Sequence, residues 1–115
     1  MQTYSIIIAE EAENDLHDIW LYIAVNDLPA KADDLRDVLK KKCYSLSYIP
    51  ERGRRVCELE ELNIFDFHEI FYKPYRIIYK LVNNTVFIYG IFDGRRELKE
   101  PLLKRISNNT TSCLL

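Results

Sequence analysis

Residues 67–97 read FHEIFYKPYRIIYKLVNNTVFIYGIFDGRRE, and this stretch decides the fold, because it predicts three consecutive antiparallel strands that end in a double arginine. β-Branched and aromatic residues fill the runs 67–72, 75–82 and 85–92, as is typical of strands. Lys73-Pro74 ends the first run, because proline lacks a ladder donor and fixes φ. Asn83-Asn84 tolerates the positive φ that a two-residue hairpin turn requires.

The second and third runs differ in how their apolar side chains are distributed. In run 75–82 the side chains alternate, so that one face carries Tyr75, Ile77, Tyr79 and Leu81 and the other carries Arg76, Ile78, Lys80 and Val82. Run 85–92 is apolar on both faces apart from Tyr89. We therefore expect residues 85–92 to form the interior strand of the three.

The N-terminal part of the chain predicts a strand followed by two antiparallel helices. Tyr4–Ala9 is a short apolar strand, and after Glu10 the apolar period becomes helical until about Val25-Asn26. We expect Asp27 to cap a second helix whose first turn accepts Pro29. The buried stripes are Ala12, Leu16, Ile19, Trp20 and Ile23 in the first helix, and Ala32, Leu35, Leu39, Cys43 and Leu46 in the second.

Two further segments complete the chain. Residues 51–66 predict a polar connector, and its arginines Arg52, Arg54 and Arg55 are interpreted as a solvated loop. Leu98, Leu102, Leu103 and Ile106 predict one or two helical turns, which Pro101 limits. We expect one domain over residues 1–106 and a flexible tail over residues 107–115.

The order of these elements predicts an α+β fold: an N-terminal strand, an antiparallel helix pair, a three-stranded antiparallel meander and a short C-terminal helix. The two long helices must bury their apolar stripes against one face of the sheet. We expect the opposite face to be largely open, which would make it a partner-binding surface or an aggregation hazard.

Net charge and cysteine content indicate which kinds of partner and which cellular location the sequence favours. The formal charge is −2, which is a poor balance for a nucleic-acid-binding protein, although residues 50–106 are basic overall while residues 1–49 are acidic. Three cysteines without metal-ligand spacing, and no apolar leader, predict a reduced cytoplasmic location. Cys43 is interpreted as a core residue. We expect no cofactor, no metal and no membrane span.

The runs PYRIIY (74–79) and GRREL (94–98), in this element order, resemble the RelE/ParE superfamily of toxins from bacterial type II toxin-antitoxin (plasmid stabilisation) modules. The resemblance covers residues 3–106. It implies one of two activities. One branch of the superfamily cleaves messenger RNA in the ribosomal decoding site, and the other, ParE-like branch blocks DNA gyrase without a known hydrolytic step.

For the ribonuclease branch, the resemblance implies that Arg76 and Arg96 hold phosphate oxygens and leaves His68 as the one proton carrier. Two lysines of that pattern fall here on His68 and Ile70, and no tyrosine follows Arg96. These departures and the acidic balance favour the ParE-like branch, with Arg76, Arg95 and Arg96 as its functional surface. Whether the chain is an enzyme stays open.

Other interpretations of the same residues stay open as well. Arg76 is equally consistent with an ion pair to Glu69 across the hairpin, and His68 with an ordinary half-exposed strand residue. A third hypothesis is a protein that mainly binds its antitoxin, a small DNA-binding protein, with toxicity weak or lost. We expect Arg76 and Arg96 to present their guanidinium groups together where the strands end.

Overall fold

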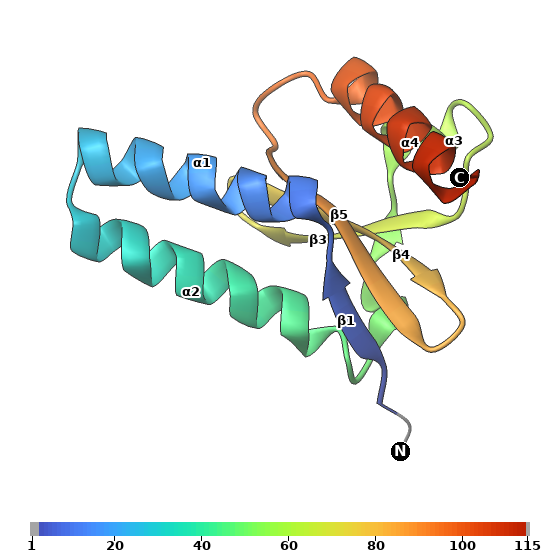
Figure 1. Ribbon diagram of the computed structural model, residues 1–115, viewed down its shortest axis with the longest axis horizontal. Coiled ribbons are helices and arrows are strands. Elements are labelled where there is room, and N and C mark those ends of the chain that lie inside the picture. The colour runs from blue at the N-terminus through green and yellow to red at the C-terminus, as the bar shows by residue number, and fades with distance from the viewer. Residues whose placement is uncertain (1–2, 115) are drawn as a thin grey trace.

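The computed structural model describes residues 3–114, with side chains for residues 3–107, and places a five-stranded mixed sheet at its centre (Figure 1). The strand order is β1 (Ser5–Ile8), β5 (Thr85–Asp93), β4 (Tyr75–Val82), β3 (Phe67–Tyr72) and β2 (Arg54–Arg55). β1 runs parallel to β5, and every other neighbouring pair is antiparallel. The predicted meander is confirmed, but β4 is the central strand of its three, and β5 is interior in the whole sheet because β1 pairs with its other edge.

Two long helices follow β1 and form a hairpin that extends beyond the sheet (Figure 1). α1 (Glu10–Asn26) begins with three glutamates, which suit the positive end of the helix dipole. α2 (Pro29–Ser45) begins with the proline that was expected in its first turn. The expected cap is wrong, because Leu28 is the N-cap residue and Asp27 instead pairs with Lys31 at 3.3 Å.

The main core lies between this helix pair and one face of the sheet. Its buried members are Ala12, Leu16, Leu39, Cys43, Leu46, Ile70, Tyr75, Ile77, Tyr79, Val86, Ile88 and Ile91. The alternation predicted for β4 therefore holds, because its odd-numbered side chains all face the helices. Cys43 is fully buried, and this burial raises the pKa of its thiol to about 12, which confirms its structural interpretation.

The opposite face of the sheet is covered, so the expectation of an open face is wrong. A second core lies there, made of Val56, Leu59, Phe67, Ile78, Phe92, Leu98 and Leu102. Its cover comes from α3 (Cys57–Glu60) and α4 (Lys99–Leu114), which lie together above the sheet in Figure 1. Pro101 is the third residue of α4, where the missing N–H costs nothing, so the helix runs well past the one or two turns expected.

The connector between α2 and β3 is structured and is not a solvated loop. It forms a 3-10 turn (Pro50–Arg52), the edge strand β2 and the helix α3. Val56 and Leu59 anchor it, because both side chains are buried in the second core. Arg54 and Arg55 are exposed on the edge strand, where charge discourages further strand pairing.

A bulge in β5 sets which side chains reach each core. The pairing passes from Ile78 opposite Gly90 to Tyr79 opposite Ile88, so Tyr89 is the extra residue. Ile88 and Ile91 both face the helix pair as a result. The flexibility predicted for residues 107–115 stays a prediction: the α4 backbone is described to Leu114, but side chains beyond Ser107, including that of Cys113, lie outside the described residues.

Candidate functional site

Arg76 is the most enclosed of the arginines that the sequence analysis singled out. Its side chain leaves β4 on the face that α3 and α4 cover, and the residue is 8% exposed. Arg76 Nε donates to Glu69 Oε1 at 2.6 Å, and Nη2 donates to Glu69 Oε2 at 3.1 Å. Nη1 and Nη2 also donate to the Glu58 carboxylate of α3 at 2.7 and 2.8 Å. The ion pair with Glu69, one of the two interpretations of Arg76, is thus present.

This ion cluster occupies the guanidinium group almost completely. A guanidinium has five N–H donors, and the four bonds to Glu58 and Glu69 leave one. Glu69 is itself 1% exposed and accepts a further bond from Arg54 Nε at 3.2 Å. Arg76 therefore holds α3 against the sheet, and its guanidinium is not presented to solvent beside Arg96 as expected.

The cluster makes stability depend on pH in a defined direction. The Arg76 hydrogen bonds lower the pKa of Glu58 below its ordinary value of 4.5. Because the folded pKa is depressed, the pair stabilises the fold fully above the unfolded pKa, and the contribution is lost as pH falls through the folded pKa. We expect the free energy of unfolding to fall more steeply between about pH 5 and pH 3 than it does in Glu58→Gln.

Urea titrations of both proteins across that range measure the difference. Asp15 acts in the opposite direction, because burial raises its pKa, but it is present in both proteins and cancels in the comparison. Parallel curves for the two proteins would show that Glu58 contributes nothing to the acid sensitivity.

The turn after β5 lies directly on the stem of Arg76. Gly94 N donates to Pro74 O at 2.7 Å, and this bond ties the turn to the start of β4. A Cβ at Gly94 would lie 2.9 Å from Pro74 O and 3.1 Å from Arg76 Cδ, so only glycine allows the close approach. The fold therefore brings Gly94-Arg95-Arg96 next to Arg76 in space, although it buries one guanidinium and exposes the others.

Arg95 is exposed but held in a fixed orientation. Its Nε and Nη2 donate to the two carboxylate oxygens of Asp93 at 3.0 and 2.7 Å, and its backbone N donates to Asp93 Oδ1 at 2.9 Å. These bonds lower the pKa of Asp93 to about 2. Arg96 is exposed in the same turn, where its backbone N donates to Asp93 O at 3.2 Å. The double arginine is thus a surface feature with defined geometry.

Two tyrosines that the sequence analysis did not single out lie near this turn. Tyr75 begins β4, and burial followed by the charge of Asp93 raises its pKa. Tyr22 projects from α1 and is 66% exposed. Both act electrostatically on Arg95, whose pKa is raised mainly by its bonds to Asp93. We call the exposed residues Tyr22, Arg95 and Arg96 the arginine surface.

His68 lies on the other face of the sheet from Arg76. It pairs with Tyr79 in the β3–β4 ladder, and the two ring centroids are 6.0 Å apart. Tyr79 faces the helix pair, whereas Arg76 and Glu69 face α3. The sheet itself separates His68 from Arg76, so the two side chains cannot act on one phosphate group.

Comparison with known proteins assigns this chain to a protein family. The profile of the ParE toxin of the type II toxin-antitoxin system parDE matches residues 6–98. The chain belongs to the ParE toxin family. It is therefore a type II toxin-antitoxin toxin of the RelE/ParE superfamily. A search of curated proteins finds no match.

Solved structures share the fold at low sequence identity. The chromosomal ParDE toxin-antitoxin system from P. aeruginosa gives a TM-score of 0.67 at 15% identity, covering 79% of this chain and 96% of that one. The RelBE2 complex from Mycobacterium tuberculosis gives 0.59 at 22% identity, covering 81% and 93%. A free arginine-to-alanine mutant of the E. coli toxin RelE gives 0.60 at 17% identity, covering 93% and 98%.

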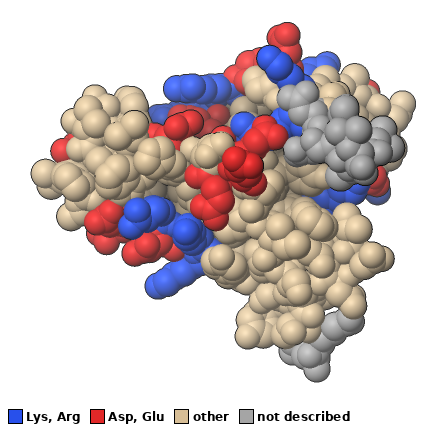
Figure 2. All heavy atoms as spheres, viewed as in Figure 1, with Lys and Arg blue, Asp and Glu red and all other residues tan. Residues whose placement is uncertain are grey.

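The end of the helix hairpin gives this ParE-family toxin an exposed apolar surface. Leu21, Tyr22, Val25 and Leu28 are each about half exposed or more, and Val25 reaches 73%. Figure 2 shows mainly uncharged side chains at this end, whereas Lys, Arg, Asp and Glu intersperse along the rest of the two helices. We call these four residues the hairpin tip. Tyr22 belongs to both the hairpin tip and the arginine surface.

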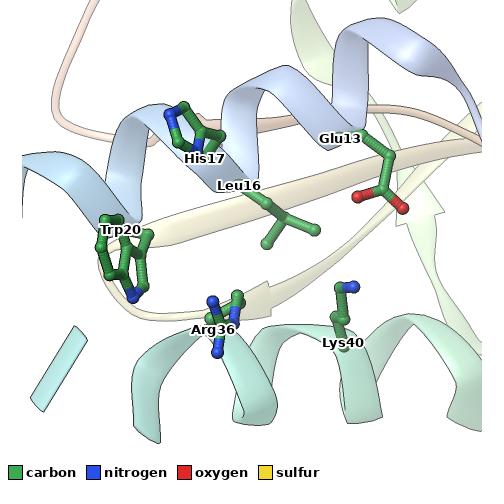
Figure 3. A pocket seen from close by; sticks show the side chains of 6 residues that line it. All are labelled: Glu13, Leu16, His17, Trp20, Arg36 and Lys40. Atoms are coloured by element: carbon green, nitrogen blue, oxygen red, sulfur yellow. The ribbon is translucent and has the colours of Figure 1, made fainter. Parts of the chain in front are cut away.

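A groove of about 290 Å³ runs between the two helices of the toxin (Figure 3). Its lining is Glu13, Leu16, His17, Trp20, Arg36 and Lys40. The Trp20 side chain projects from α1 toward Arg36 on α2, and its Nε1 donates to Asp33 Oδ1 at 2.8 Å. Arg36 lies 6.0 Å from the Trp20 ring centroid. These contacts join the two helices, so we assign the groove a structural role.

The described part of the toxin lacks two further kinds of feature. Among its described side chains, no three His, Cys, Asp or Glu gather as a metal site requires. None of the helices described for it combines the length and the apolar character that a membrane span requires.

Proposed function

We propose that this toxin acts in the ParE manner, by binding a protein target without hydrolysis, and that the target is DNA gyrase. The observation that carries the proposal is the difference in exposure between its arginines: Arg76 is enclosed by two carboxylates, whereas Arg95 and Arg96 are exposed on the surface. A buried Arg76 serves the fold, and an exposed pair serves contact with another molecule.

The geometry disfavours the alternative of a RelE-like messenger RNA endonuclease. Attack by a 2′-hydroxyl requires donors aimed at the phosphate and a proton carrier within hydrogen-bond reach of the same atoms. Glu58 and Glu69 would have to release Arg76 before it could hold a phosphate. His68 would still lie on the other side of the sheet. These contacts support a toxin that does not cleave RNA.

The arginine surface and the hairpin tip are suited to protein binding. Tyrosine and arginine are the residues that most often dominate interface energetics, and Arg95 is preoriented by Asp93, which reduces the entropy lost on binding. The hairpin tip adds contiguous apolar area that the isolated chain leaves exposed. We therefore place the gyrase contact at Tyr22, Arg95 and Arg96.

A cognate antitoxin is the second partner that we propose. Two of the similar solved structures are of a toxin-antitoxin system and a toxin-antitoxin complex. We infer that a small DNA-binding antitoxin binds and neutralises this toxin in the cytoplasm. Coexpression with the neighbouring small gene is expected to abolish the growth arrest that the toxin causes alone. If the toxin expressed alone does not arrest growth, its toxicity is weak or lost.

The target is tested by two assays on the purified toxin. We expect it to inhibit supercoiling by gyrase and to leave ribosome-bound message intact. Arg96→Ala is expected to relieve growth arrest at least tenfold without lowering the melting temperature, because the side chain is exposed. The matched control, Arg55→Ala, removes an exposed arginine of the edge strand and is expected to stay toxic.

His68→Ala separates the two activities further, and we expect it to leave toxicity nearly unchanged. Cleaved message with unaffected gyrase, and loss of toxicity in His68→Ala, would replace the proposal with the endonuclease. A large fall in the stability of Arg96→Ala would make Arg96 a structural residue instead.

A further inference from the structure

A shallow, open cavity of about 400 Å³ lies at the C-terminal end of α2, far along the chain from the double arginine. Its lining is Val38, Lys41, Lys42, Ser45 and Arg52. The first four lie at i, i+3, i+4 and i+7 of α2 and so share one helix face, and Arg52 comes from the following 3-10 turn. Three of the five lining residues are cations, and none is acidic.

These three cations lack a carboxylate partner among the described residues. Most arginines of the toxin are paired, including Arg36, Arg54, Arg76, Arg95 and Arg105. No salt bridge within the described part of the chain involves Lys41, Lys42 or Arg52. Asp37, one turn before Lys41, is within 4.0 Å of Arg36 instead. The cavity is therefore lined by three cations without an ion pair, in a chain that is slightly acidic.

Arg52 is preoriented at the mouth of this cavity. Its Nη2 donates to Ser45 Oγ, and its Nη1 donates to Ser45 O at 3.3 Å. Ser45 Oγ in turn donates to Lys42 O at 2.6 Å. These contacts use two of the five guanidinium N–H groups and leave the others for an anion. The helix C-terminus accounts for the lysines and for the bond from Arg52 to Ser45 O, and the remaining N–H groups of Arg52 are still available to a ligand.

An exposed aromatic ring lies beside the cations. Tyr44 lies three residues after Lys41 in α2 and so projects beside it, and Tyr48 lies in the turn that follows the helix. Tyr44 is 52% exposed and Tyr48 62%. Cations that follow a phosphate backbone, next to rings on which bases stack, are the usual combination in single-stranded nucleic-acid binding.

We propose that Lys41, Lys42, Ser45 and Arg52 form a phosphate-binding pocket that takes the backbone of a single-stranded nucleic acid, with Tyr44 stacking an adjacent base. The ligand group is a phosphodiester, bound by the Arg52 fork and two ammonium groups. The pocket uses no residue of the arginine surface, so its test does not depend on whether gyrase is the target.

Fluorescence anisotropy with a short labelled oligothymidylate and the matching oligouridylate tests the pocket on the full-length toxin. At about 50 mM salt we expect each lost phosphate contact to weaken binding roughly tenfold and to reduce the slope of log K against log salt by about 0.7. Lys41→Ala/Lys42→Ala should therefore lose both contacts. The control Lys31→Ala/Lys104→Ala removes the same charge from exposed positions elsewhere and should bind within twofold of the parent.

Two further measurements identify the ligand chemistry. In amide NMR spectra, added inorganic phosphate is expected to shift the resonances of Lys42, Ser45 and Arg52 and to leave that of Lys31 unchanged. Arg52→Lys is expected to weaken the binding of the oligonucleotide more than the binding of phosphate. Equal loss of affinity in the two double variants would overturn the proposal, as diffuse charge would then suffice. A polyglutamate peptide that competes as well as the oligonucleotide would also overturn it, in favour of an acidic protein segment.

Discussion

Arg76→Ala is expected to lower the free energy of unfolding by about 3–5 kcal/mol, because it removes one partner of a buried ion pair and leaves the other uncompensated. Glu69 has no exposed side-chain area, so its carboxylate would keep only the bond from Arg54. Glu58 would lose its ion pair with the sheet, and α3 would keep only the apolar anchor of Val56 and Leu59. Urea unfolding followed by circular dichroism measures the change.

A paired substitution distinguishes the ion cluster from simple loss of packing. Arg76→Met/Glu69→Leu replaces both charges with apolar side chains of similar size, so we expect it to be more stable than Arg76→Ala. Arg76→Ala should also lose toxicity in proportion to its folded amount, unlike Arg96→Ala, which should stay folded and lose activity. An Arg76→Ala protein within about 1 kcal/mol of the parent would contradict the structural role.

Arg105→Ala is expected to lower the free energy of unfolding by about 2–4 kcal/mol and to loosen α4 before the rest of the fold. Arg105 Nη1 and Nη2 donate to Asp15 at 2.6 and 3.2 Å, and Nε lies 3.0 Å from Glu11. The guanidinium also lies 4.7 Å from the Phe92 ring centroid. One side chain thus joins α4 to α1 and to the sheet.

The reason for the large effect is the position of Asp15. β1 pairs with β5 only as far as Ile88, and Asp15 Oδ2 accepts the Ile91 N–H at 3.0 Å beyond that point. Burial raises the pKa of Asp15, and the Arg105 bonds offset only part of this rise. Without Arg105 a mostly buried carboxylate would lack its counter-ion.

Hydrogen exchange reports the local part of this prediction. Amides of α4 and the Ile91 amide should exchange faster in Arg105→Ala, whereas β4 amides should follow global stability only. Lys104→Ala, at an exposed neighbouring position, is the control and should change the stability by less than about 0.5 kcal/mol. Unchanged protection of α4 in Arg105→Ala would show that apolar packing alone holds the helix.

The strands and long helices were predictable because their signals are local. Alternation in residues 75–82 reports which face each side chain occupies, and the structure places Ile77 and Ile78 in opposite cores as that pattern requires. Pro29 and the Asn83 turn, where φ is 55°, follow from backbone restrictions that a single residue imposes. Such features do not depend on the rest of the chain.

The second core was not predictable in the same way. Val56 and Leu59 are two apolar residues in a polar connector, and they acquire a role only because α4 packs over them. Tyr22 likewise joins the candidate site only because α1 brings it near Arg95, which lies far along the chain. Contacts between distant segments leave no periodic signal in either segment.

The local pattern of residues in the sequence therefore specifies the strands, the helix pair and the turn that carries Arg95 and Arg96. Only the assembled fold decides which arginine is available. Glu58 from the connector and Glu69 from β3 converge on Arg76 and enclose it, whereas Arg95 meets one carboxylate at the surface. The sequence cannot distinguish these arginines, because whether a charge is buried and paired depends on residues that become neighbours only when the chain folds.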